Sequence, residues 1–203
     1  YYKTNIMEQS TFIKINPASV LAFIENHDTD RFLDNGDNLP MLKQAATLLL
    51  TTRRIPQLYY GTEVMMNGTK EKSDGYVRKD FPGGWAGDKE TAFTPEGRTA
   101  LQNECYNFFK TILNWRKGNE VIAKGSMVQF MVQEGVYAYA RQHEGKTVFV
   151  MLNGTDSATT VPLKFYREIL GDKSQGKDIL SGKQITFGEA LTMQPRESLV
   201  IEL

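Results

Sequence analysis

A polar run directly after an apolar segment holds the side chains best suited to chemistry in this chain. Residues 23–31 read FIENHDTDR and include His27, one of only two histidines in the sequence. Imidazole and carboxylate groups can move protons or hold the hydroxyl groups of a bound molecule. The apolar residues 20–24 predict a short buried strand, and barrel-type α/β proteins gather catalytic side chains at the carboxyl ends of their strands. The polar run is therefore a candidate active site.

A second strand and two helices are expected after this run. Residues 34–38 form a turn cluster, and a helix is predicted over 39–53, with a proline in the first turn, where a missing N–H costs nothing. A strand is predicted at 57–60. The Thr-Pro pair at 94–95 indicates the start of another helix, which a glycine at 118 ends. Between them, 61–94 lacks periodicity and is longer than ordinary loops, which indicates a functional or disordered segment.

The pattern changes character after residue 118. Alternating or continuous apolar runs between turn signals predict an antiparallel β module. Its strands are expected at 128–132, 136–140, 147–152, 159–163, 179–180 and 199–203. We predict two domains, 1–118 with βα units and 119–203 as a β-sandwich, so the fold class is α/β plus all-β. Two βα units alone would leave sheet edges unpaired, so we expect the chain to be the C-terminal piece of a larger protein.

The composition excludes several classes of function. The chain has 203 residues with 24 basic and 24 acidic side chains, so no nucleic acid partner is expected. No apolar stretch reaches the roughly 18 residues of a membrane span, and no signal peptide is visible. Cys105 is the single cysteine, cannot form an internal disulfide, and is predicted to be a buried apolar residue. No acidic cluster has metal-ligand spacing, so neither a metal nor another cofactor is implied.

Three motifs resemble those of a known family. FIENHD at 23–28 resembles the F-x-x-N-H-D motif of the α-amylase family of glycoside hydrolases, at the end of the seventh strand of their (β/α)8 TIM barrel. IPQLYYGTE at 55–63 resembles the stretch at the eighth strand, although Arg54 replaces the family's usual glycine. RKDFPGGW at 78–85 is similar to a loop of the cyclomaltodextrinase and neopullulanase-like subgroup. The resemblance covers essentially the whole chain and implies the last two βα units of the barrel followed by a C-terminal antiparallel β-sandwich.

This resemblance also implies a function. The parent would be a retaining α-glucan hydrolase that acts on α-1,4-glucosidic bonds of cyclodextrin, pullulan or starch oligosaccharides, through an oxocarbenium-like transition state. Asp28 would bind hydroxyls of the sugar at the cleavage point, and His27 would donate a hydrogen bond to the same sugar. Further substrate-contacting candidates are Asn26, Tyr60, Arg78 and Trp85.

The catalytic pair itself is expected outside this chain. In the family, the nucleophile and the proton donor come from the fourth and fifth barrel strands. No matching strand end precedes residue 23. We therefore expect the chain to be inactive alone and to need the missing N-terminal barrel half as its partner.

Several side chains have two interpretations at this stage. Trp85 could stack on a glucose ring or pin its loop to the barrel. Arg78 could contact substrate or pair with Asp80. Arg31 is expected to be a structural ion-pair partner, and Glu25 is expected to be structural as well.

Two alternative functions also stay open. A glucanotransferase of the same family is one, because water and a sugar hydroxyl compete for one glycosyl-enzyme intermediate. A non-catalytic carbohydrate-binding or interaction module is the other. Its sugar platform would come from aromatic residues whose pattern favours core packing instead: Tyr137, Tyr139, Phe149, Phe165 and Phe187. By analogy with enzymes that carry the same loop, the expected location is the periplasm of a bacterium.

Overall fold

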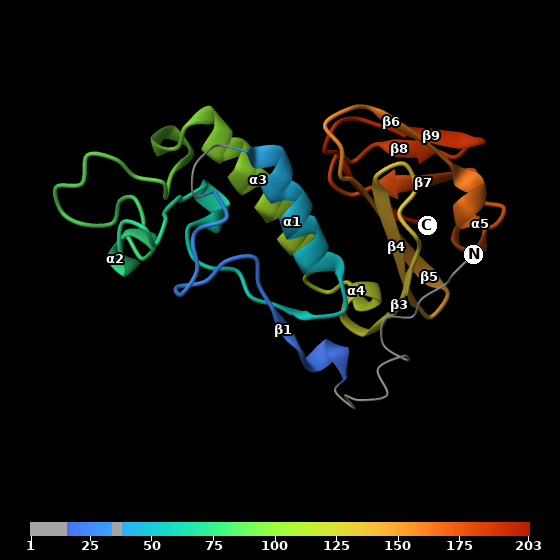
Figure 1. Cartoon of the computed structure of the whole chain (residues 1–203), viewed down its shortest axis with the longest axis horizontal. Coiled ribbons are helices and arrows are strands. Elements are labelled where there is room, and N and C mark those ends of the chain that lie inside the picture. The colour runs from blue at the N-terminus through green and yellow to red at the C-terminus, as the bar shows by residue number, and fades with distance from the viewer. Residues whose placement is uncertain (1–15, 34–37) are drawn as a thin grey trace.

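The computed structural model describes residues 16–33 and 38–203 and arranges them in two parts (Figure 1). Two helices lie side by side at the centre, a β-rich part lies at one end, and a long loop extends from the other. Most of the segment before residue 20 and nearly all of the turn predicted at 34–38 lie outside the described residues. Within the described ranges, no helix is both long and apolar enough to cross a membrane.

Two short strands begin the helical part and pair in parallel. β1 (Leu21–Ala22) lies beside β2 (Ile55–Pro56). The strand predicted at 20–24 is shorter than expected and is not buried, since Leu21 is 53% exposed. Its apolar side chains face solvent because the pair has no further sheet neighbour among the described residues. The strand predicted at 57–60 is wrong, because pairing with β1 uses the two residues before it and the chain then turns.

Helix α1 (Leu39–Thr51) forms where the apolar spacing predicts it. Asn38 caps it by accepting a hydrogen bond from the Met41 N–H at 3.1 Å, and Pro40 stands in the first turn. Its apolar face packs on α3 (Ala100–Arg116). The core that the two helices share includes these buried residues: Leu42, Ala46, Leu50, Cys105, Phe109 and Ile112.

Helix α3 begins later than predicted. Thr99 caps it, because the Thr99 hydroxyl accepts from the Gln102 N–H and the Gln102 side chain accepts from the Thr99 N–H. Thr94 makes no such bond and precedes a separate 3-10 turn, η3 (Pro95–Gly97). The predicted stop is confirmed, since Gly118 follows the helix with a φ of +107°.

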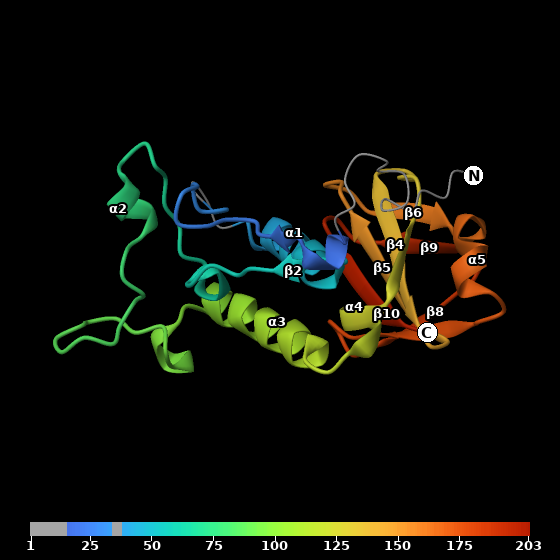
Figure 2. The ribbon, with the colours of Figure 1, turned by 90° about the horizontal axis from the view of Figure 1, so that it is seen from below.

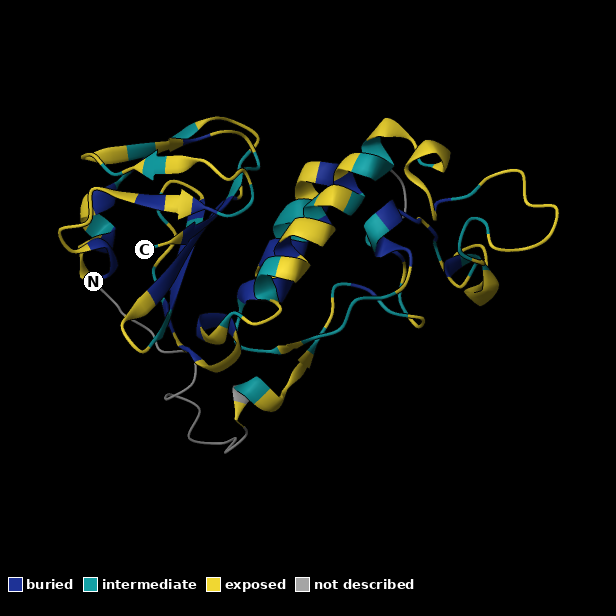
Figure 3. Cartoon of the chain, turned by 180° about the vertical axis from the view of Figure 1, so that it is seen from behind, coloured by how far each residue is buried: buried dark blue, intermediate teal, exposed yellow. Residues whose placement is uncertain are grey.

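The segment 61–94 is as irregular as its sequence predicts. It holds the 3-10 turn η2 (Thr62–Val64) and the one-turn helix α2 (Asp74–Val77), and no strand. Figure 3 shows that its outer part is mostly exposed. A small buried cluster ties its two ends together: Val64, Met66 and Ala92.

The β-rich part is built from two antiparallel sheets, which confirms the predicted antiparallel β domain. Six strands run in the order β3-β4-β5-β10-β7-β8, and β6 pairs with β9. The strands of the larger sheet are β3 (Ser126–Gln129), β4 (Val136–His143), β5 (Lys146–Asn153), β7 (Gln175–Asp178), β8 (Gln184–Thr186) and β10 (Ser198–Glu202). The remaining elements are β6 (Thr159–Pro162), β9 (Ala190–Met193), η1 (Pro17–Ser19), α4 (Glu120–Lys124), η4 (Leu163–Tyr166) and α5 (Arg167–Leu170). Both sheets contribute to one core, which contains Phe149, Val161 and Met193.

One predicted strand of this domain is wrong. Residues 179–180 form a turn, because the Asp178 carboxylate accepts hydrogen bonds from the N–H groups of Leu180 and Ser181. β7 lies just before this turn. The apolar pair that indicated a strand packs instead against the helical part and the sheet.

The aromatic residues considered as a sugar platform pack into the cores. Tyr139 and Phe149 are fully buried. Tyr137, Phe165 and Phe187 are partly buried and pack against the domain's hydrophobic clusters. Core packing, the favoured interpretation from the sequence, therefore describes this set.

Strand β4 joins the β domain to the end of α1, next to α4 (Figure 2). The hydroxyls of Tyr139 and Thr51 are hydrogen-bonded. Arg141 is fully buried, and its guanidinium donates to the carbonyls of Thr51 at 2.8 Å, Ile122 at 2.9 Å and Gly125 at 2.8 Å. Burial lowers the pKa of Arg141 to about 10, so this side chain stays charged at neutral pH. The two parts are thus linked by directed polar contacts as well as by apolar packing.

Candidate functional site

The polar run after β1 folds into a compact turn that presents two side chains to solvent. The Asn26 side chain accepts a hydrogen bond from the Asp28 N–H at 2.8 Å, and the Asn26 N–H donates to the Thr29 hydroxyl at 3.0 Å. Such Asx turns are a standard use of asparagine. The side chains of His27 and Asp28 are 60% and 64% exposed, with 3.1 Å between His27 Nε2 and Asp28 Oδ2. The predicted pair is therefore adjacent and accessible.

Arg78 reaches this turn from the end of α2. Its Nη2 lies 3.1 Å from Asp28 Oδ1, and its Nε donates to the His27 carbonyl at 2.9 Å. The alternative partner considered from the sequence, Asp80, is not the one found. Asp74 is the second carboxylate near Arg78, at 3.5 Å, because α2 places residues four apart on one face.

Lys70 and Asp74 also belong to this group and were not predicted from the sequence. Lys70 Nζ donates to the Asp28 carbonyl at 3.1 Å and lies 3.5 Å from Asp74 Oδ1. The backbone N–H of Lys70 donates to Asp30 Oδ1 at 2.5 Å. The only sequence signal is the four-residue spacing of 70, 74 and 78. That spacing has meaning only once a helical turn at α2 is known.

Tyr60 and Trp85 have a looser relation to this group. The Tyr60 hydroxyl donates to the Lys79 carbonyl at 2.6 Å, so it borders the group through the residue after Arg78. Trp85 is 70% exposed and none of the hydrogen bonds around Asp28 involves it. It lies two residues after Gly83, whose φ is +93° and where a Cβ would lie 2.6 Å from Thr91, so the turn that displays the indole requires glycine.

Residues expected to be structural beneath the turn are indeed buried. Glu25 and Arg31 are 2% and 1% exposed and form an ion pair with each other at 3.2 Å. Cys105 is also fully buried, and burial raises the pKa of its thiol to about 12. A thiol of that kind is not a nucleophile at neutral pH. The chemistry available at this turn is that of Asp28, His27 and Arg78, which can accept and donate hydrogen bonds to a polar ligand.

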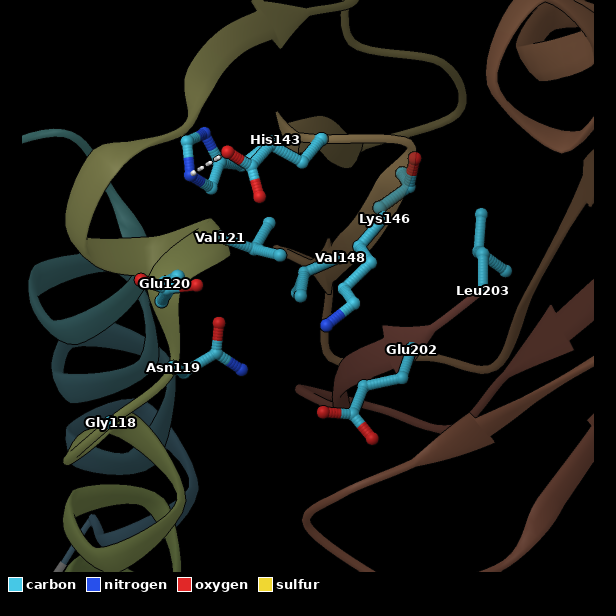
Figure 4. Close-up of a pocket in the computed structure, with 11 residues that line it drawn as sticks. Gly118, Asn119, Glu120, Val121, His143, Lys146, Val148, Glu202 and Leu203 are labelled. Carbon is cyan, nitrogen blue, oxygen red and sulfur yellow. Dashed lines mark ion pairs between the residues drawn. The ribbon is translucent and has the colours of Figure 1, made fainter.

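A separate pocket of about 400 Å³ lies between α4 and the end of the larger sheet (Figure 4). It contains a group that could hold a metal ion, since ligand atoms of Glu120, His143 and Glu144 lie within 4.8 Å of one another. Glu120 already pairs with Lys124 at 2.6 Å, and this contact lowers the Glu120 pKa. The sequence gives no sign of this group because its members come from distant segments.

Comparison with known proteins identifies relatives over most of the chain. Residues 127–202 match the family described as the cyclo-malto-dextrinase C-terminal domain. The chain is 31% identical to a cyclomaltodextrin glucanotransferase of Thermoanaerobacterium thermosulfurigenes, over 88% of this chain and 24% of that protein. It is 28% identical to an α-amylase of Niallia circulans, over 84% of this chain and 29% of that protein.

Solved structures show the same fold. A cyclomaltodextrin glucanotransferase with a three-domain ABC distribution is similar with a TM-score of 0.68 at 25% identity, over 92% of this chain and 37% of that chain. The chain belongs to the α-amylase family. An α-amylase of Anoxybacillus, at 18% identity, gives a TM-score of 0.71 over 92% of this chain and 38% of that one, which shows that the family fold is kept at low identity.

The family likeness extends beyond the β domain. Because the alignment with the glucanotransferase covers 88% of the chain, it includes most of the helical part that carries the Asp28 group. The chain spans 24% of that relative and 29% of the α-amylase. The chain thus corresponds to roughly a quarter of each of these two relatives.

Proposed function

We propose that this chain supplies the sugar-holding part of the active site of a retaining enzyme that cleaves α-1,4-glucosidic bonds. The observation that carries the proposal is the Asp28 carboxylate, which is 64% exposed between Arg78 on one oxygen and His27 on the other. In retaining glycosidases, hydrogen bonds to ring hydroxyls tighten as the sugar distorts toward the transition state. Asp28 would accept such bonds, and His27 would donate one to the same ring.

The nucleophile and the proton donor would come from outside this chain. We propose that they lie on earlier strands of a (β/α)8 barrel whose last two βα units are the ones described above. The exposure of Leu21, Phe23 and Ile55, at 53%, 43% and 48%, supports this, because neighbouring strands would cover these apolar side chains. The missing barrel half is then the partner of this chain, and the chain alone has no turnover.

The substrates would be cyclodextrin, pullulan or starch oligosaccharides, and water would be the acceptor. The loop at 78–85 and the match of residues 127–202 to the cyclo-malto-dextrinase C-terminal domain both support a neopullulanase-like hydrolase. In this proposal Asn26 shapes the turn, while Tyr60, Arg78 and Trp85 contact the bound glucan. The exposed Trp85 would stack on a glucose ring. By the same analogy, the enzyme would act in a bacterial periplasm.

A glucanotransferase is the second candidate. The 31% identity to a cyclomaltodextrin glucanotransferase favours it. Both activities share one glycosyl-enzyme intermediate, so Asp28 and His27 would have the same roles. Product analysis separates the two, because a transferase makes cyclic or longer glucans and a hydrolase makes only shorter ones.

The test uses this chain and the longer protein encoded by the sequence that contains it. The chain alone should not hydrolyse maltooligosaccharides or cyclodextrin. In the longer protein, Asp28→Asn should lower kcat/KM by about 100-fold or more, since a transition-state contact is lost. Asp156→Asn, which removes an exposed carboxylate of the β domain, is the control and should leave kcat/KM unchanged. Unchanged kcat/KM in the Asp28 variant, or turnover by the chain alone, would overturn the proposal.

A further inference from the structure

A buried ion pair lies directly beneath the polar turn. Glu25 and Arg31 are 2% and 1% exposed, and 3.2 Å separates Glu25 Oε1 from Arg31 Nη1. A buried pair of this kind contributes little net stability, because the desolvation of two charges offsets their attraction. What it offers over an apolar pair is a set of hydrogen bonds with fixed directions.

Arg31 joins separate segments of the chain through three of its N–H groups. Its Nε donates to the Val77 carbonyl at 3.0 Å, and its Nη1 donates to the Tyr60 carbonyl at 2.6 Å. Its backbone N–H donates to the Gly68 carbonyl at 2.9 Å. The guanidinium carbon also lies 4.0 Å from the centre of the Tyr59 ring. Only a rigid guanidinium fork reaches acceptors in two such segments and an aromatic face at once.

Glu25 binds two more groups around the same turn. Its carboxylate accepts from the Phe32 N–H at 2.5 Å and from the Thr62 hydroxyl. The first contact closes the polar turn at its base, because residues 25 and 32 flank it. The second ties the turn to η2, so Glu25 and Arg31 together fix the turn, η2 and α2 relative to one another.

The contact between Arg31 and α2 determines the position of the Arg78 backbone. Helix α2 ends at Val77, whose carbonyl Arg31 holds. Arg78 is the next residue, and its guanidinium lies 3.1 Å from the Asp28 carboxylate. We propose that Glu25 and Arg31 are positioning residues that set the geometry of Asp28 and Arg78 for a bound sugar. The inference rests on the proposed function, in which Asp28 holds that sugar.

The test measures hydrogen exchange at the Arg78 Nε–H by NMR of the ¹⁵N-arginine-labelled chain. Two variants separate positioning from plain stability. Arg31→Lys keeps the charge and loses the fork. The double variant Glu25→Leu with Arg31→Met replaces the pair with apolar side chains, so neither charge is left buried without its partner. We expect Arg78 to exchange about tenfold faster or more in both variants, because its backbone is no longer held.

A surface arginine provides the control. Arg196→Met removes an exposed pair with Asp156 in the β domain and should leave exchange at Arg78 unchanged. Slow exchange at Arg78 in the folded Arg31→Lys variant would overturn the proposal, and so would slow exchange in a double variant with the parent's thermal midpoint. No sugar enters this measurement, so its outcome is independent of the Asp28→Asn result that tests the proposed function.

Discussion

Two buried tyrosines of the β domain differ in the partners of their hydroxyl groups. The Tyr139 hydroxyl is hydrogen-bonded to Thr51, whereas the Tyr166 hydroxyl has no hydrogen-bond partner among the described residues. Removing a hydrogen-bonded buried hydroxyl leaves its partner without a hydrogen bond. Removing a buried hydroxyl that has no partner removes the cost of its desolvation. We expect Tyr139→Phe to lower the free energy of unfolding by about 1–2 kcal/mol and Tyr166→Phe to leave it unchanged or raise it. Urea unfolding measures both, and the reverse order would contradict the assignment.

The same two residues make stability depend on pH in the alkaline range. Burial raises the pKa of Tyr166 from its ordinary value of 10.0 to about 12, and it raises the pKa of Tyr139 as well. The unfolded chain loses these protons first as the pH rises, so the contribution of the two tyrosines to the free energy of unfolding is intact below about pH 10 and falls above it. Thermal midpoints measured across this range should fall less steeply in the double variant Tyr139→Phe with Tyr166→Phe. Parallel curves for the parent and this variant would exclude the tyrosines as the cause.

At the candidate site, the residue types could be predicted from the sequence but their partners could not. Asn26, His27 and Asp28 are consecutive, so their proximity follows from the chain itself. The carboxylate partner considered for Arg78 was Asp80, and the structure shows Asp28 instead, while contact of Arg78 with substrate stays a prediction. That contact joins residues far apart in the sequence and depends on how the irregular segment 61–94 folds back, which no local pattern encodes.

At the scale of elements, the start of α3 shows how one hydrogen-bonding motif decides a boundary. Thr99 forms a capping box with Gln102, whereas Thr94 makes no side-chain cap. We expect Thr99→Ala to lower the free energy of unfolding by about 1 kcal/mol and Thr94→Ala to change it by much less. Chemical denaturation of the two variants checks this. An equal loss at both positions would mean that the helix begins at the earlier threonine.

The elements that were predicted well are those whose burial is local. Helix α1 and the central strands β4 and β5 have apolar faces covered within this chain, so their periodicity matches their structure. The strands β1 and β2 were predicted less well. Each strand has only two paired residues, and the outer faces of both strands are exposed. Their apolar sequence suits a larger sheet, and the proposal of a preceding barrel half accounts for this difference.

At the scale of the whole molecule, the larger sheet of the β domain is covered on both faces. One face packs in the core shared with β6 and β9, and the other packs against α4 and the two long helices. A polar bond reinforces the second contact, since the Trp115 indole N–H of α3 donates to the Glu202 carboxylate of β10 at 2.7 Å. The β domain thus depends on the helical part for one of its buried faces.

This dependence gives the test of the domain boundary that we propose between residues 118 and 119. The segment 119–203 keeps the core shared by both sheets, so we expect it to fold alone and to give an antiparallel β circular dichroism spectrum. It loses the cover that Thr51 and the long helices give to Tyr139 and Arg141, so its thermal midpoint should lie below that of the whole chain.

The variant Arg141→Met sharpens this experiment. In the whole chain it should be strongly destabilising, because it leaves three buried carbonyls without their donor. In the isolated segment the cost should be smaller, because the Thr51 carbonyl is absent and solvent reaches the uncovered face. If 119–203 is unfolded on its own, the boundary is wrong and both parts share one cooperative core. If it folds and Arg141→Met costs the same in both contexts, the contact with α1 contributes nothing to stability.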